Sequence, residues 1–256
     1  MYPILFEFGS LKIYSYGFSL AIAFIVATYL AKLEASRQGI AGEKILDLSL
    51  CIAISGILGA RILYVLQNLE FYLENPVQML MLNRGGLSFY GGFILAAICA
   101  NIFLKRKHLP FVKTFDIVIP YLALAQAIGR IGCFLNGCCY GKPTDFILRL
   151  YFPGQNIARH PVQIYNSLNL LLIFGILRIF QSKRRAVGYL SGQTFLLYCL
   201  LYSTMRFFME YLRGDHLPVF VNLTIHQLIS AGIFIISCLI WWKKWPFRLE
   251  RWKNFA

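Results

Sequence analysis

Apolar stretches of about 20 residues follow one another along the whole 256-residue chain, and they constrain its fold more than any other feature. An α-helix of that length crosses the hydrocarbon core of a bilayer, whereas a membrane β-barrel shows short alternating segments. Hydrophobic residues make up 58% of the chain and charged residues 14%, against about a quarter charged in a soluble domain. The sequence therefore predicts an all-α, polytopic membrane protein.

Seven membrane spans are predicted, at about residues 13–31, 45–66, 86–104, 115–134, 161–177, 187–208 and 221–242. The chain has 25 Lys and Arg residues. Sixteen lie in the segments that follow the first, third, fifth and seventh spans, which share one side of the membrane; six lie in the segments on the other side, and three lie within spans. Because basic loops remain in the cytoplasm, we expect the N-terminus outside and the C-terminus in the cytoplasm. This placement accounts for the net charge of +14 and leaves little support for nucleic-acid binding. One integral membrane domain is expected, over residues 1–256.

One polar stretch, GRIGCFLNGCCYGKPT at residues 129–144, follows the predicted fourth span. It places Arg130 at membrane depth, where a charged side chain is costly unless it is paired or faces a cavity. Four glycines, Asn136 and three cysteines surround this arginine, a density that a plain spanning helix does not need. The chemistry is expected here.

Two more span arginines, Arg61 and Arg206, are predicted near the outer ends of their helices. Arg206 and Glu210 are four residues apart, with Arg213 three further on, so they form one polar stripe on a helix. Arg61 is expected either to bind a ligand or to extend toward the membrane interface. Arginine binds phosphate through paired, charge-assisted hydrogen bonds, so a surplus of arginine in an outward-facing membrane pocket favours a phospholipid headgroup.

Several blocks carry a family resemblance. GRIGCFLNGCCYG resembles the signature GRxGNFxNxExxG of the prolipoprotein diacylglyceryl transferases. YSYG, GARILYV, RGGLSFYGG, HPVQIY and RFFMEYLRGD resemble that family's other blocks, in the same order, over nearly the whole chain. The resemblance implies a multi-pass enzyme of the bacterial inner (cytoplasmic) membrane that works in lipoprotein biosynthesis.

The implied reaction moves the diacylglyceryl group of phosphatidylglycerol to the lipobox cysteine thiol of a preprolipoprotein, forming a thioether as glycerol phosphate leaves. Its partners would be that lipid and the signal peptides of preprolipoproteins, with no cofactor and no metal. In this reaction the arginines would hold the phosphate and stabilise the charge that develops on it. The implied catalytic residues are Arg130, Arg206, Tyr90, Asn136 and Glu210, and the implied phosphatidylglycerol-binding residues are Arg130, Arg206, Tyr16, Gly141 and Arg61.

The chain departs from the resembled pattern where a base would stand. The family usually has His in place of Tyr90, Asn in place of Cys133, Glu in place of Cys138, and Glu in place of Asn166. A Tyr with the ordinary pKa of about 10 is a poor base at neutral pH compared with His. These differences concern the proton acceptor and leave the arginines untouched.

Two other functions remain open from the sequence. Cys133, Cys138 and Cys139 suit a membrane thiol oxidoreductase, although CxxxxCC lacks the CxxC spacing of the familiar redox motif. Three sulfurs without a clear fourth ligand make a weak case for zinc. A non-enzymatic phospholipid-binding protein would use the same arginines without any chemistry.

Overall fold

The computed structural model describes residues 1–8, 11–81, 85–154, 156–187, 192–214 and 223–244. Residues 188–191 of the predicted sixth span, residues 221–222 of the seventh, and Arg84 lie outside the described residues. In chain order the elements are β1 Ile4–Phe8, β2 Leu11–Tyr14, α1 Ser15–Arg37, α2 Gly42–Gln67, α3 Leu69–Glu74, the 3-10 helix η1 Pro76–Leu80, α4 Phe89–Arg106, α5 Phe111–Leu135, α6 Val162–Val187, α7 Gln193–Glu210 and α8 Ile225–Lys244.

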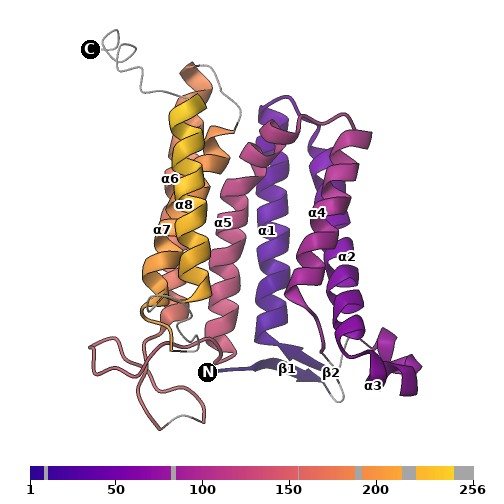
Figure 1. Ribbon diagram of the computed structural model, residues 1–256, viewed down its shortest axis with the longest axis vertical. Helices are drawn as coiled ribbons and strands as arrows, with labels where there is room; N and C mark the ends of the chain where they lie inside the picture. Colours follow the sequence, from indigo (N-terminus) through magenta and orange to yellow (C-terminus); the bar gives the residue numbers. More distant parts are fainter. Residues whose placement is uncertain (9–10, 82–84, 155, 188–191, 215–222, 245–256) are drawn as a thin grey trace. The chain divides into compact units, whose positions relative to one another are not determined.

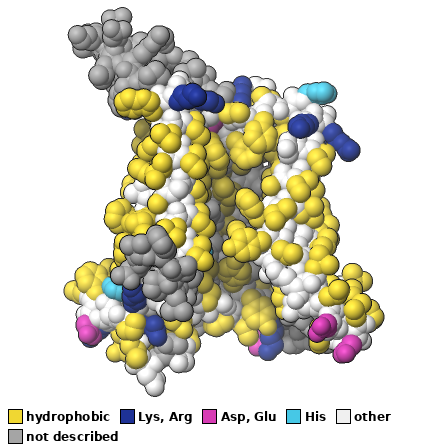
Figure 2. Space-filling model, in the orientation of Figure 1, with side chains coloured by type: hydrophobic (Ala, Val, Ile, Leu, Met, Phe, Trp, Pro, Cys, Tyr) yellow, Lys and Arg dark blue, Asp and Glu magenta, His cyan; other side chains and the backbone are white. Residues whose placement is uncertain are grey.

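The prediction of a helical membrane protein is confirmed. Within the described part of the chain, six helices are long and apolar enough to cross a membrane, namely α1, α2, α4, α5, α6 and α8. Apolar side chains cover the flanks of the helices on the face in Figure 2, with charged side chains near their ends. The predicted sixth span coincides with α7, a helix of 18 residues. Its crossing of the membrane and the orientation of the termini stay predictions.

The chain forms two compact units. One consists of Met1–Ala27 with Phe115–Ala256, and the other is Thr28–Thr114. In the second unit α2 packs against α4, and Gly59 and Gly91 make this possible, because a Cβ on either would collide with the backbone carbonyl oxygen of the other. Small residues let membrane helices approach closely in this way.

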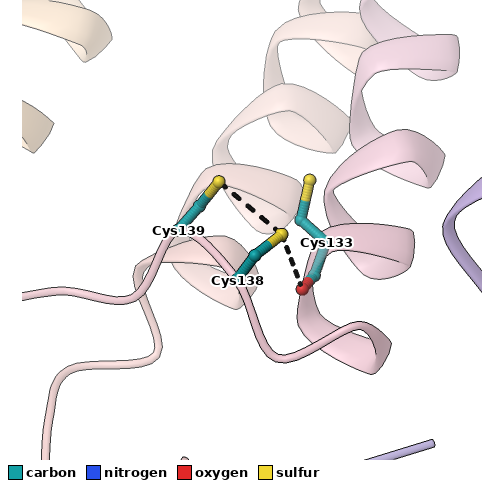
Figure 3. Close-up of side chains that lie close together, drawn as sticks. All are labelled: Cys133, Cys138 and Cys139. Carbon is teal, nitrogen blue, oxygen red and sulfur yellow. Dashed lines mark hydrogen bonds between the residues drawn. The ribbon is translucent and has the colours of Figure 1, made fainter. Parts of the chain in front are cut away.

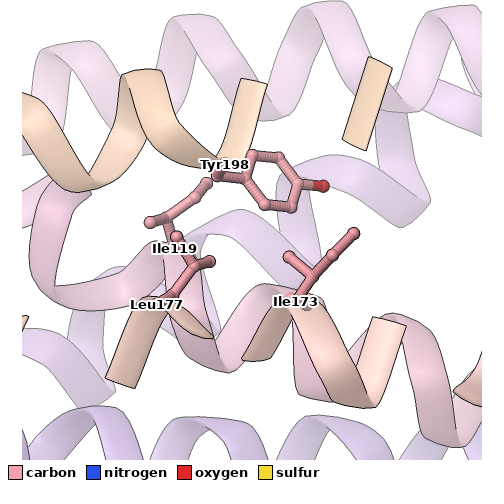
Figure 4. Close-up of a cluster of buried hydrophobic side chains, with 5 residues drawn as sticks. Ile119, Ile173, Leu177 and Tyr198 are labelled. Atoms are coloured by element: carbon pink, nitrogen blue, oxygen red, sulfur yellow. The ribbon is translucent and has the colours of Figure 1, made fainter. Parts of the chain in front are cut away.

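In the first unit α5, α6, α7 and α8 run side by side (Figure 1). A buried core cluster joins α5, α6 and α7. It consists of Ala123 and the four side chains labelled in Figure 4, Ile119, Ile173, Leu177 and Tyr198. The Tyr198 hydroxyl donates to Gln126 Oε1 at 2.9 Å, which satisfies the polar end of a buried ring.

Asp116 of α5 is buried and fixes the start of α7. Its carboxylate accepts hydrogen bonds from the backbone N–H groups of Gly192 and, at 2.8 Å, Phe195. The first N–H groups of a helix have no partner within the helix, and a negative charge there also interacts favourably with the positive end of the helix dipole. The one charge in the first half of the predicted fourth span thus serves helix capping.

The end of α5 is set by the sequence Asn136–Gly137–Cys138. Gly137 takes φ +74°, its N–H donates to Phe134 O at 3.1 Å, and the Cys138 N–H donates to Cys133 O at 3.1 Å. This pair of bonds around a left-handed glycine is the Schellman motif, which ends a helix and turns the chain back over its last turn. It returns Cys138 to the level of Cys133.

Candidate active site

The best-defined charged group of the first unit is a buried ion pair near the end of α7. Arg206 Nη2 lies 3.1 Å from Glu210 Oε2, and the two side chains are 14% and 1% exposed. Thr224 Oγ1 donates to the other carboxylate oxygen of Glu210 at 3.0 Å. Thr224 is itself held by a capping box at the start of α8, in which the Thr224 N–H donates to Gln227 Oε1 and the Gln227 N–H to Thr224 Oγ1. Glu210 is therefore anchored from two helices and fixes one side of Arg206.

The ion pair leaves positive charge in excess. Arg130 of α5 and Arg213, just after α7, both lie close enough to Arg206 to repel it electrostatically, with Glu210 as the attracting carboxylate. Arg206 Nη1 is buried and has no hydrogen-bond partner among the described residues. Among the described residues, Glu210 is the carboxylate that acts on Arg206, two further guanidinium groups lie in range of it, and one buried N–H group of Arg206 has no partner there. An anionic ligand fulfils both requirements.

Three thiols gather beside these arginines. The sulfur atoms of Cys133, Cys138 and Cys139 all lie within 4.8 Å of one another, and the Sγ atoms of Cys138 and Cys139 are 3.8 Å apart (Figure 3). The pKa of the Cys139 thiol is lowered to about 5. The largest cause is a hydrogen bond from Cys133, followed by a hydrogen bond from Cys138 and the charges of Arg213 and Arg130; burial acts in the opposite direction and raises this pKa. Burial raises the pKa of Cys138 in spite of a hydrogen bond from Asn136. These interactions favour the thiolate form of Cys139 over that of its two neighbours.

Gly141 fixes the loop that carries these thiols. Its N–H donates to His160 O at 2.9 Å, and the next residue's N–H donates to Leu212 O at 2.8 Å, so that Gly141 and Arg213 are paired as in an antiparallel ladder. A Cβ on Gly141 would lie 2.5 Å from Val162 Cγ2 and 2.6 Å from Leu212 O. Glycine is required here for the approach of two backbones, and this approach places Arg213 beside the thiols.

The predicted polar face of α6 is buried in the same unit. Gln163 and Asn166 are 1% and 3% exposed, and Gln163 Nε2 donates to Cys138 O at 2.6 Å. Gln163 Oε1 and Asn166 Nδ2 are buried without a hydrogen-bond partner in the part of the chain that the structure describes. Gln163 thereby adds a buried acceptor next to Cys138, and Asn166 adds a buried donor one helical turn further along α6.

Tyr16 also belongs to this group. It lies in the first turn of α1, which can approach α5 closely because a Cβ at Gly132 would lie 2.7 Å from Ser19 Cβ and 3.4 Å from Tyr16 Cα. The phenol is in electrostatic range of Arg130 and of the three thiols. The structure thus brings together six of the expected residues, Tyr16, Arg130, Asn136, Gly141, Arg206 and Glu210.

The other two expected residues belong to the second unit. Tyr90 lies in the first turn of α4, with its side chain 67% exposed and an edge-to-face contact to Phe89. Arg61 is 8% exposed, and its guanidinium makes all five of its possible hydrogen bonds to backbone carbonyl oxygens. The acceptors, at 2.5–3.1 Å, are the carbonyl groups of Gln78, Met79, Met81, Gly85 and Gly86. Arg61 thus neither extends to an interface nor presents a free N–H group in this arrangement; it fastens the segment before α4.

Sequence reasoning missed two contributors to the site. Thr224 was detectable as the first residue of a T-x-x-Q capping box, but its bond to Glu210 joins residues 14 positions apart across two helices. The sharing of charge between Cys139 and Arg213 had no sequence signal, since they meet only through the backbone pairing at Gly141.

The helices and the site define a multi-pass membrane protein in which clustered arginines lie beside clustered thiols. A sequence model of the family described as prolipoprotein diacylglyceryl transferase matches residues 3–243. The chain is 36% identical to the phosphatidylglycerol–prolipoprotein diacylglyceryl transferase of Clostridium tetani, over 94% of this chain and 96% of the relative. The enzymes of the same name from Finegoldia magna and Lactobacillus acidophilus are 34% and 32% identical, over 93% of this chain and 93% and 88% of theirs. The chain belongs to the prolipoprotein diacylglyceryl transferase family.

Proposed function

We propose that the protein transfers the diacylglyceryl group of phosphatidylglycerol to the lipobox cysteine of preprolipoproteins. The observation that carries the proposal is the buried Arg206, which lies in electrostatic range of Arg130 and Arg213 and has one buried N–H group without a partner among the described residues. Charged side chains within membrane helices mark ligand sites by default. The abundant phosphate ester of a bilayer is the phospholipid headgroup, which arginine binds through two parallel hydrogen bonds.

In the proposed reaction the acceptor thiolate attacks the glyceryl carbon that bears the phosphate. The S–C bond forms, the C–O bond breaks, and glycerol phosphate leaves with the bonding electrons, while the thiol proton passes to water or to the leaving phosphate. Arg130 and Arg206 stabilise the charge on the departing phosphate. Glu210 orients Arg206, and Asn136 is a further catalytic residue of the same unit. The Tyr90 hydroxyl is assigned a separate role, which is to hold the acceptor or the headgroup by a hydrogen bond.

The remaining binding residues support the lipid in different ways. Tyr16 contacts the headgroup from α1, and Gly141 acts through the loop that positions Arg213. Arg61 contributes to lipid binding by holding the segment before α4, because its own N–H groups are occupied. An apolar groove between α7 and α8, lined by Phe207, Phe208 and Phe234 among others, suits an acyl chain.

The proposed enzyme is one domain of the bacterial cytoplasmic membrane with seven spans, an outside N-terminus and a cytoplasmic C-terminus. α7 packs against both α6 and α8, and its 18 residues extend about 27 Å at 1.5 Å per residue, close to the thickness of the hydrocarbon core. A reporter fused after Arg185 should therefore be cytoplasmic; an outside signal there contradicts the topology.

Transfer is tested with the purified protein in vesicles that contain phosphatidylglycerol labelled in its glyceride moiety. A lipobox peptide with cysteine should acquire the label as a thioether that resists alkaline hydrolysis, and the same peptide with serine should not. Arg206→Lys should lose most of the activity, since one ammonium cannot reproduce the guanidinium fork. Unchanged labelling of the peptide by Arg206→Ala would refute the phosphate site.

A further inference from the structure

The three thiols beside the arginines form a ready-made set of metal ligands. Zinc binds thiolate sulfur at about 2.3 Å in tetrahedral geometry, which places two sulfur ligands about 3.8 Å apart. The Sγ atoms of Cys138 and Cys139 are already 3.8 Å apart. The Sγ atom of Cys133 lies within 4.8 Å of both, so an adjustment of about 1 Å completes the triangle. Figure 3 shows the three side chains converging from the end of α5 and from the loop that follows it.

The backbone holds this convergence in place. The Schellman turn at Gly137 returns Cys138 to Cys133. Cys139 then adopts φ +62°, a left-handed conformation that costs a non-glycine residue about 1 kcal/mol or more and persists where the neighbours impose it. On the C-terminal side of Cys139, the guanidinium carbon of Arg159 lies 4.9 Å from the centroid of the Tyr140 ring. The next residue, Gly141, is paired with Arg213. The strained residue that aims the third sulfur is thus fixed on both sides.

We propose that Cys133, Cys138 and Cys139 bind a zinc ion with an open fourth position. No further Cys, His, Asp or Glu among the described residues completes the group. Structural zinc sites have four protein ligands, whereas catalytic sites have three and leave the fourth for water or substrate. The missing fourth ligand, which made zinc a weak inference from the sequence, is the property that a reactive site requires. The proposal replaces the expectation that no metal is present.

The neighbouring charges suit such a site. Zinc with three thiolates carries one net negative charge, and a fourth thiolate raises this to two. Arg130 and Arg213 both interact electrostatically with Cys139 and balance that charge. The arginine cluster therefore serves the phosphate on one side and the metal thiolates on the other.

The fourth ligand follows from the proposed function, on which this step of the inference rests. The acceptor is itself a cysteine, and a thiol that binds zinc is deprotonated outright. The lipobox thiol gives its proton to water as it binds the zinc, and its sulfur then attacks the glyceryl carbon. Glycerol phosphate leaves with the C–O electrons, and the neutral thioether, a poorer ligand, dissociates. Zinc would then replace a basic residue in this chain, in which Tyr90 stands where the family has His.

The metal is tested first without any activity measurement. The full-length protein, incubated with zinc in detergent and freed of excess metal, should retain about one zinc per chain by elemental mass spectrometry. The Cys139→Ser variant should retain less than one tenth of that amount. So should the double variant Cys133→Asn/Cys138→Glu, which restores the residues usual in the family and guards against a folding defect. Cys238→Ala, a change of an exposed cysteine on α8, should retain the wild-type amount.

The open position is tested with cobalt(II) as a spectroscopic substitute. The cobalt protein should show thiolate-to-cobalt charge-transfer absorption. A lipobox peptide should raise it by roughly one third, as Co–S bonds increase from three to four, and the serine peptide should not. Chelator treatment of the wild type should lower diacylglyceryl transfer at least tenfold, with recovery when zinc is restored.

The outcomes separate the two proposals. Zinc that is absent from the wild type, or retained by the cysteine variants, overturns the metal site. Full transfer by the chelated protein overturns the metal's part in the reaction and leaves the transferase intact. Stoichiometric, cysteine-dependent zinc in a protein that never labels the peptide overturns the proposed function and leaves the metal site standing.

Discussion

Replacing Arg61 separates a structural arginine from one that binds lipid. In the structure its guanidinium donates five hydrogen bonds, to the carbonyl oxygens of Gln78, Met79, Met81, Gly85 and Gly86. Each such bond contributes about 0.6–1 kcal/mol net within a membrane protein. Arg61→Met keeps the apolar stem and removes all five, so the free energy of unfolding should fall by about 3–5 kcal/mol. Arg61→Lys has at most three N–H groups, so it should lose about 1–2 kcal/mol.

The free energy of unfolding is measured by SDS titration in mixed micelles, followed by circular dichroism. A matched control is Arg149→Lys, since Arg149 makes an exposed ion pair with Asp145 at 2.9 Å; exposed pairs contribute about 0–1 kcal/mol, so its change should be within about 0.5 kcal/mol. The apparent KM for phosphatidylglycerol is measured on the same samples. If Arg61→Lys unfolds like the wild type while its KM rises tenfold, Arg61 contacts the lipid and the structural assignment is wrong.

Four further predictions concern the first unit. Glu210→Gln should lower kcat more than stability, because Arg206 loses its orienting charge but keeps a hydrogen-bond acceptor; equal kcat in both forms would contradict this role. Gly141→Ala should cost about 1–3 kcal/mol in unfolding free energy, because its Cβ meets Leu212 O at 2.6 Å; an unchanged unfolding curve would exclude the close approach. Asp116→Ala should cost about 1–2 kcal/mol through the lost cap of α7, whereas Asp116→Asn, which keeps one acceptor oxygen, should cost less. In chelator-treated protein, iodoacetamide should modify Cys139 at a rate that rises through about pH 5 and is level by pH 7. The reason is that the lowered pKa makes the reactive thiolate the neutral-pH form of Cys139. A rate that still rises above pH 8 would refute the shift.

The sequence by itself determined the class of structure, most of the helices and the arginine-rich character of the site. A bilayer forces a spanning segment to satisfy its own backbone hydrogen bonds, so apolar runs of sufficient length have few alternatives to helices. The i, i+4 spacing of Arg206 and Glu210 likewise required only a helix for the ion pair to form. Local geometry was enough in both cases.

Only the tertiary structure decided what the individual polar residues do. Arg61 and Arg206 look alike in sequence, each a single arginine within an apolar helix, yet one makes five bonds to backbone carbonyls and the other keeps a buried N–H without a partner. Three sulfurs without a clear fourth ligand made only a weak case for zinc in the sequence, because sequence spacing does not reveal a left-handed residue at Cys139 or a backbone pairing between Gly141 and Arg213. Which donors remain free, and which sulfurs meet, depends on contacts between segments far apart in the chain, and no local pattern encodes those distances.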